Sequence, residues 1–147
     1  MKISTRGRYA LRMMVELART QGDGYVSLTD IATKQGISKK YLEQIIPLLS
    51  RENYLQTARG LKGGYRLSRT PAEYKVGEVL RLRGGSLAPV TFVCPDASWF
   101  CDKCNECPTY PLWKKLSRIV SDYLDSVTLE DLVENRIELD SMDDAKL

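Results

Sequence analysis

The sequence predicts a mainly α protein with a winged helix-turn-helix domain, a β-hairpin wing and a long C-terminal dimerisation helix. Three observations predict this fold. Apolar residues recur at helical spacing in three segments that end by residue 51. A glycine-rich loop then separates two strand-like stretches, 55–58 and 65–68. Finally, residues 109–126 form one long amphipathic stretch.

Capping residues mark the ends of three helices within residues 4–51. The first helix covers about residues 4–20. Ser27 opens the second helix with a capping box, and Gly36 ends it. Ser38 caps the third helix, whose apolar residues share one face. Pro47 lies inside this helix and is expected to kink or shorten it, because proline lacks a backbone N–H.

The remaining elements follow from turn chemistry. Three glycines in the loop at 59–64 favour the tight turn of a hairpin wing. A further helix is expected at about 76–83, stopping at a glycine pair, and the long helix then runs over 109–126. Thr128 caps a short closing helix.

The net charge of +3 conceals an asymmetry along the chain. Residues 1–83 hold 16 Lys and Arg against 7 Asp and Glu, whereas residues 84–147 hold 6 against 12. A basic surface attracts phosphates, so the partner of the first part is expected to be a polyanion. A solvated basic face without a partner is the alternative.

The second helix of a helix-turn-helix enters the major groove of double-stranded DNA. Gln44 is suited to adenine, and Glu43 is suited to the amino group of cytosine. Glu43 is therefore either a discriminator between operators or an ordinary solvated residue. Cations at the tip of the wing would flank the minor groove. The residues predicted to contact DNA are Arg8, Ser38, Lys39, Lys40, Tyr41, Glu43, Gln44, Arg59, Lys62, Gly63, Gly64 and Tyr65.

The apolar stripe of the long helix lacks an obvious partner in its own chain. The same helix of a second subunit would cover it in an isologous homodimer, and packing back onto the first helix is the alternative. The predicted interface residues are Leu112, Leu116, Ile119, Val120 and Tyr123.

All four cysteines lie within fourteen residues, with the spacing C-x6-C-x2-C-x2-C, and the chain has no histidine. Such a density of thiolates suits an iron-sulfur cluster, 2Fe-2S or 4Fe-4S, or a structural zinc ion. A metal-free thiol or disulfide switch is the third interpretation. Acidic neighbours increase the need for a bound cation, which favours a metal. The predicted ligands are Cys94, Cys101, Cys104 and Cys107.

These patterns exclude membrane proteins, secreted proteins and enzymes, and they divide the chain into four expected parts. No stretch approaches the roughly 18 apolar residues of a membrane span, and charges interrupt the first apolar run, so neither a membrane segment nor a signal peptide is expected. A cytoplasmic location follows, where thiols stay reduced. No activated nucleophile is evident, so an enzyme is not expected. The parts are a winged helix-turn-helix DNA-binding domain at 1–83, a cysteine-rich sensor loop at 84–108, a dimerisation helix at 109–127, and a closing helix with an acidic tail at 128–147.

The chain resembles the winged-helix regulators typified by the iron-sulfur cluster regulator IscR, the nitric-oxide sensor NsrR and the cysteine-metabolism repressor CymR. The resemblance covers nearly the whole chain, and it implies a homodimeric transcription factor that binds a palindromic operator. The motifs that carry it are Lys2 to Ala10, Ile37-Ser38 with Tyr41 to Gln44, Arg59-Gly60 with Gly63 to Tyr65, and Cys107 to Thr109 leading to Leu112-Trp113.

The resemblance also bears on the ligands. Three cysteines bind iron in cluster-bearing members of this family, together with a fourth ligand that is a histidine or an acidic residue. Tyr110 and Arg8 stand at those two fourth-ligand positions here, so Cys104 is the economical replacement. The cysteines at the matching places are Cys94, Cys101 and Cys107.

The resemblance leaves rival functions open. In the leading hypothesis, cluster binding orders residues 94–107 and thereby fixes the spacing of two DNA-reading heads. A cysteine-metabolism-type repressor controlled by a partner enzyme or a thiol switch is one alternative, and a zinc-stabilised DNA-binding protein is another. An electron-transfer or metal-trafficking protein built on the same scaffold is a third.

Overall fold

The computed structural model describes residues 3–20, 22, 24–82, 87–88 and 106–138. Within these ranges the chain is mainly helical, with one two-stranded antiparallel hairpin, as predicted. The elements are α1 (Thr5–Arg19), α2 (Leu28–Gln35), α3 (Lys39–Arg51), β1 (Leu55–Ala58), β2 (Gly64–Leu67), the 3-10 turn η1 (Pro71–Glu73), α4 (Val76–Arg81), α5 (Tyr110–Ser126) and α6 (Leu129–Val133).

Serine side chains cap the first three helices. Ser4 accepts a hydrogen bond from the backbone N–H of Gly7 at 3.0 Å. Ser27 and Ser38 make the equivalent bonds at the starts of α2 and α3. Gly36 ends α2 with a φ of 61°, a left-handed conformation that glycine adopts without steric cost. The two serine caps and the glycine stop predicted around α2 and α3 are therefore confirmed.

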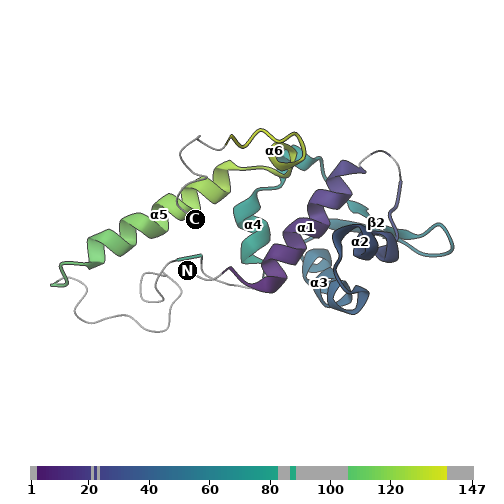
Figure 1. The fold of residues 1–147 in the computed structure, drawn as a ribbon, viewed down its shortest axis with the longest axis horizontal. Helices are drawn as coiled ribbons and strands as arrows, with labels where there is room; N and C mark the ends of the chain where they lie inside the picture. The colour runs from purple at the N-terminus through teal and green to yellow at the C-terminus, as the bar shows by residue number, and fades with distance from the viewer. Residues whose placement is uncertain (1–2, 21, 23, 83–86, 89–105, 139–147) are drawn as a thin grey trace.

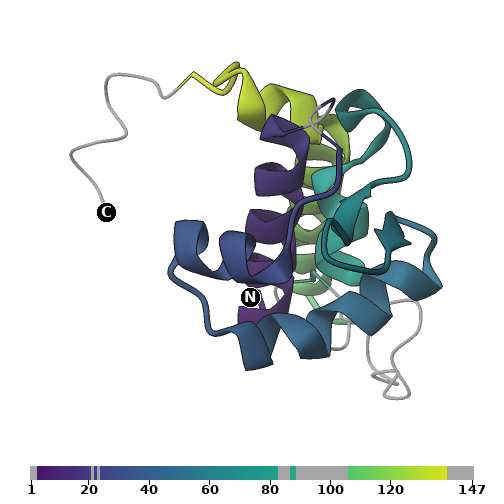
Figure 2. The same cartoon turned by 90° about the vertical axis from the view of Figure 1, so that its right-hand side faces the viewer.

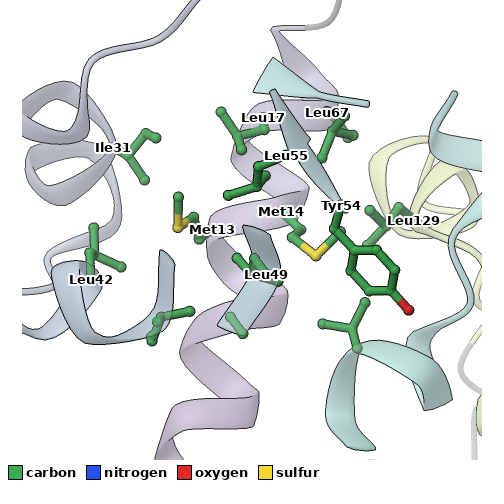
Figure 3. Close-up of a cluster of buried hydrophobic side chains, with 14 of the residues drawn as sticks. Met13, Met14, Leu17, Ile31, Leu42, Leu49, Tyr54, Leu55, Leu67 and Leu129 are labelled. Atoms are coloured by element: carbon green, nitrogen blue, oxygen red, sulfur yellow. The ribbon is translucent and has the colours of Figure 1, made fainter. Parts of the chain in front are cut away.

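Helix α1 lies at the centre of the core. It contacts α2, α3 and β2 on one side and α4 and α6 on the other (Figure 1). Its methionines Met13 and Met14 are completely buried, and both lie among leucines from the surrounding elements (Figure 3). Leu129 of α6 is also fully buried and belongs to the same cluster. The core thus joins residues that are more than a hundred positions apart.

The hairpin pairs in the register Leu55 with Leu67 through Ala58 with Gly64. Its second strand begins one residue earlier than the predicted stretch. A backbone bridge adds Val26 to the same edge, because Val26 and Tyr65 exchange two N–H···O bonds of 2.9 Å. The segment before α2 is therefore bonded to β2 at this one position, outside the two-stranded hairpin.

Pro47 does not shorten α3. The helix continues through this position to Arg51. Proline removes one intrahelical hydrogen bond, but Ile45 and Leu49 on either side of it are completely buried. Burial of each such side chain contributes about 1.5–3 kcal/mol, which outweighs the lost bond.

Helix α5 extends away from the rest of the molecule, in the direction opposite to the wing (Figure 1). Its C-terminal end is attached to α4 by an ion pair in which the Arg81 guanidinium donates to both carboxylate oxygens of Asp125, at 2.6 and 3.0 Å. Backbone bonds from Val76 to Val127 and from Leu129 to Tyr74 continue this attachment. We call these contacts the α4–α5 joint.

No helix among the described residues is long and apolar enough to cross a membrane.

Tyr74 holds the chain where it leaves the wing. The side chain is completely buried, and its hydroxyl accepts hydrogen bonds from the backbone N–H groups of Ser68 and Arg69, both at 3.0 Å. The same hydroxyl donates to the carbonyl of Tyr54 at 2.9 Å. One oxygen therefore bonds three backbone groups at the end of β2 and the start of β1, two of which, the Ser68 N–H and the Tyr54 carbonyl, also bond to each other at 3.1 Å.

Replacing Tyr74 with phenylalanine should lower the free energy of unfolding by about 1–3 kcal/mol, because the backbone groups at this buried site lose their bonds to the hydroxyl, although the Ser68–Tyr54 backbone bond remains. Urea denaturation would show a lower midpoint with an unchanged m-value. Tyr25→Phe is the matched control, since Tyr25 is only half-buried and its ring contact with Arg66 would survive the change. Equal midpoints for the two variants would contradict the assigned role of Tyr74.

Candidate functional site

The N-terminal half of α3 presents a polar face to solvent. Ser38, Lys39, Lys40, Glu43 and Gln44 are all exposed. The opposite face is formed by buried apolar residues that anchor the helix in the core. Figure 2 shows α2, α3 and the hairpin together on the side nearest the viewer, with α5 behind them. Helix α3, which carries these exposed residues, therefore lies on the same side of the molecule as the wing (Figure 2).

Tyr41 occupies a different environment from its polar neighbours. It is half-buried and meets the ring of Tyr9 edge-to-face, with centroids 5.1 Å apart. Such an aromatic pair contributes about 0.5–1.5 kcal/mol beyond area burial. Arg12 lies over the same Tyr9 ring at 5.8 Å. Tyr41 thus fixes the position of α3 on α1, and only part of its surface is open to a partner.

Gln44 has a protein partner in the free chain. The guanidinium of Arg6 donates to its side-chain oxygen at 3.3 Å, across an exposed surface. Arg6, which is half-buried, was not among the predicted contact residues, whereas Arg8, which was predicted, is exposed on α1. The signal for Arg6 was present in the basic start of the chain, but the sequence pattern did not indicate which cation would meet α3.

Four polar side chains connect α1 with the end of α2. The carboxylate of Glu16, whose side chain is 7% exposed, pairs with Lys34 at 3.1 Å and accepts from the Gln35 amide at 2.9 Å. Arg12 donates to the side-chain oxygen of Gln35 at 3.1 Å and also to its backbone carbonyl. We call these four residues the α1–α2 latch. It fixes the last turn of α2, directly before the turn that leads into α3.

The base of the wing is closely packed against the segment before α2. A Cβ atom at Gly64 would collide with the carbonyl group of Val26. Glycine is therefore required here by the close approach of two backbones. Tyr65 is half-buried beside it and makes the two bonds to Val26. Arg59 and Lys62 are exposed in the loop that connects the strands.

Arg66 is a further exposed cation on the wing that the sequence reasoning missed. Its guanidinium donates to Gln56 across the hairpin at 2.7 Å and lies over the Tyr25 ring at 4.8 Å. These two contacts hold the Arg66 side chain on one face of the hairpin, so its positive charge has a fixed position on the wing.

Of the four predicted metal ligands, only Cys107 lies in the described part of the chain, while Cys94, Cys101 and Cys104 fall outside it. Cys107 is half-buried directly before α5, and its Sγ lies 3.2 Å from the Thr109 hydroxyl. Hydrogen bonds from the Thr109 side chain, the Thr109 N–H and the Tyr110 N–H lower the pKa of this thiol, although burial opposes them. These donors stabilise a thiolate, which is the form that binds iron or zinc.

Helix α5 leaves a row of large apolar side chains uncovered. Leu112, Leu116, Ile119 and Tyr123 are between 37% and 58% exposed, and we call them the α5 seam. Val120 is half-buried beside them. Because the seam stays exposed, packing back onto α1 of the same chain does not cover it.

Comparison with known proteins agrees with this arrangement. Residues 3–135 match the model of the Rrf2 family, described as an iron-dependent transcriptional regulator. The regulator CymR of Bacillus subtilis is 39% identical over 132 residues, which cover 90% of this chain and 89% of that protein. The regulator IscR of Pectobacterium carotovorum is 35% identical over 143 residues, which cover 97% and 85% of the two chains.

Solved structures give the same result. The structure of B. subtilis CymR, described as the global cysteine regulator, superposes with a TM-score of 0.76 at 36% identity and covers 92% of this chain and 98% of its own. That of T. potens IscR has a TM-score of 0.74 at 34% identity, with 97% and 96% covered. The chain therefore belongs to the Rrf2 family of transcriptional regulators.

Proposed function

We propose that the chain is a homodimeric regulator that binds a palindromic operator in bacterial cytoplasm and senses iron-sulfur status, or redox or nitric-oxide stress, through a cysteine-ligated cluster. The observation that carries the proposal is the shared accessible side of α3 and the wing, with an uncovered apolar helix at the other end of the molecule (Figures 1 and 2). A dimer of such chains would present two DNA-reading surfaces related by a two-fold axis.

In this proposal α3 enters the major groove. Lys39 and Lys40 near its N-terminus reach phosphates or guanine, and Glu43 accepts from the amino group of cytosine. Gln44 can pair with adenine only after it leaves the Arg6 guanidinium. Arg6 would then be free to bind a phosphate, so the exchange replaces one exposed hydrogen bond with stronger contacts to DNA.

The wing supplies the second contact. Arg59 and Lys62 project from the loop and would flank the minor groove, where the negative potential attracts cations. Gly63 ends this loop, and Gly64 and Tyr65 form the start of β2 that places it. Because Tyr65 is bonded to the segment before α2, the wing and the helix-turn-helix would engage DNA as one unit.

The α5 seam supports a second copy of the chain as the dimer partner. Its residues are spaced by four, three and four positions, the pattern by which paired helices interlock. Covering the seam with its own copy would remove apolar side chains from water on both subunits. An isologous contact of this kind also produces the two-fold symmetry that a palindromic operator requires.

The chemistry around Cys107 fits a cluster or metal ligand. Cys94, Cys101, Cys104 and Cys107 would hold the group, with Cys104 as the fourth ligand. A bound cluster would supply sensitivity to oxygen, nitric oxide and iron supply. The chain contributes a thiolate at Cys107 that the Thr109 hydroxyl and two backbone N–H groups stabilise. We further propose that the sensor loop comprises residues 84–108, between the DNA-binding part at 1–83 and the dimer helix at 109–127.

A specific observation favours a second candidate function. CymR of B. subtilis, described as the global cysteine regulator, matches at 39% identity, a value as high as those of the IscR relatives. The chain would then be a cysteine-metabolism-type repressor whose effector is a partner enzyme or the oxidation of its thiols. Zinc bound by the four cysteines is a variant of this function, in which the metal has only a structural role.

Lys40→Ala should weaken binding to all DNA sequences by a similar factor, because Lys40 is exposed at the start of α3 and would contact phosphate. The slope of log K against log salt concentration should decrease in magnitude by about one. Fluorescence anisotropy over a salt series measures both quantities. Lys114→Ala on α5 is the matched control and should bind like the wild type. Identical salt slopes for wild type and Lys40→Ala would remove Lys40 from the interface.

Ile119→Glu should convert the dimer into a monomer at micromolar concentration, because each subunit would bury a carboxylate in the seam. Light scattering coupled to size-exclusion chromatography gives the mass directly. Lys114→Glu is the control, since Lys114 is exposed and lies outside the seam. A wild type that is monomeric at high concentration, or an Ile119→Glu protein that remains dimeric, would refute the assigned interface.

Anaerobically purified wild type should absorb in the range of about 320–430 nm, where thiolate ligation of iron gives charge-transfer bands, with stoichiometric iron and sulfide. Cys107→Ser should lose most of this absorbance, and Cys104→Ser should lose it too if Cys104 is the fourth ligand. A colourless wild type that carries zinc or no metal after reconstitution would reject the cluster and favour the thiol-controlled repressor.

A further inference from the structure

Leu61 is the most exposed large apolar side chain in the described part of the chain, at 109% of its reference accessibility. Within that part, the other strongly exposed apolar side chains belong to the α5 seam or, in the case of Ile137, to the segment after α6. A single exposed leucine is common on protein surfaces. The position of Leu61 is what distinguishes it, because it lies in the loop at the tip of the wing.

The wing holds this leucine away from the rest of the protein on an anchored support. The loop is closed by a backbone bond from Gly63 N–H to the Gly60 carbonyl at 3.0 Å. Below it, the strand register continues to Leu55 and Leu67, and Val26 is bonded to Tyr65 at the base. Since the support is already ordered, a contact made by Leu61 would lose less conformational entropy than one made by a free loop.

The charges around Leu61 indicate the chemistry of its partner. Arg59 and Lys62 flank it and are both exposed, and Arg66 adds a third exposed cation on the second strand. An apolar tip between cations fits poorly on a neutral apolar surface, where the cations would lose hydration without gaining a partner. It fits the minor groove of DNA, where phosphates line both sides and the walls are formed by sugar C–H groups.

We propose that Leu61 enters the minor groove beside the α3 contact and selects against guanine there. This inference rests on the proposed DNA-binding function. The amino group N2 of guanine projects from the floor of the minor groove, whereas A·T pairs expose only acceptors. The leucine methyl groups would collide with this amino group. They cannot accept a hydrogen bond, so they would also leave the amino group unsatisfied. The wing would therefore combine the salt-dependent attraction of its cations with a salt-independent preference for base pairs that lack the guanine amino group.

Two synthetic duplexes test this proposal without knowledge of the operator. Alternating dG–dC and alternating dI–dC duplexes expose the same N7 and O6 acceptors in the major groove, but inosine lacks the N2 amino group. Wild-type protein should bind the dI–dC duplex several-fold more tightly at low salt. Leu61→Ala should bind dI–dC about tenfold more weakly than wild type, as expected from the loss of one buried leucine side chain, and should lose the preference.

Two further variants separate the apolar contact from the electrostatic one. Leu61→Met should retain most of the affinity and the preference, because methionine is of similar size and apolar. Arg59→Ala should reduce the salt slope by about one, whereas Leu61→Ala should leave the slope unchanged. The Leu61 variants should unfold at the same urea concentration as wild type, since the side chain makes no contribution to the core.

Equal binding of the two duplexes by wild type would overturn the proposal. So would a Leu61→Ala protein that keeps both the affinity and the preference of wild type, because the preference would then come from the cations or from groove width. A wild type that binds neither duplex at low salt is a different result, since it contradicts the proposed DNA-binding function itself.

Discussion

The burial of α1 is the constraint on which the rest of the structure depends. This helix contacts α2, α3, α4, α6 and β2, so almost every described element is placed relative to it. Its inner residues Met13, Met14 and Leu17 are at most 2% exposed. Methionine fills irregular space well, and two adjacent methionines here meet side chains from elements on opposite sides of the helix (Figure 3). A shift of α1 would therefore move the proposed DNA-reading side, formed by α3 and the wing, together with the α4–α5 joint.

The polar residues of the same helix determine how α3 is presented. Tyr9 packs on Tyr41, and the α1–α2 latch fixes the last turn of α2 through Arg12 and Glu16. Burying the Glu16 carboxylate is acceptable because Lys34 and the Gln35 amide satisfy it. Apolar burial thus sets where α2 and α3 lie, whereas this network sets their orientation. Specific polar contacts are needed to set the orientation of these helices because the hydrophobic effect has no direction.

The sequence predicts local structure better than it predicts pairs of distant residues. Helix and strand bounds could be predicted because serine caps, Gly36 and the wing glycines act within a few residues. The shortening of α3 expected at Pro47 does not occur, because the local cost of proline is outweighed by burial that depends on the whole fold. The Arg6–Gln44 contact and the α1–α2 latch could not be predicted, since many exposed cations compete for each partner until the helices are placed.

The position of Cys107 limits how a sensor could influence the proposed DNA-reading side. Cys107 lies directly before the first turn of α5, whereas the α4–α5 joint holds the last turn through Asp125. A helix of 17 residues is about 25 Å long and bends little, so it acts as a rigid arm between these points. A small change of angle at the joint becomes a large displacement near Cys107. A displacement near Cys107 likewise changes the angle at the joint. In the proposed dimer the seams lie along this arm, so the angle at the joint would set the distance between the two copies of α3.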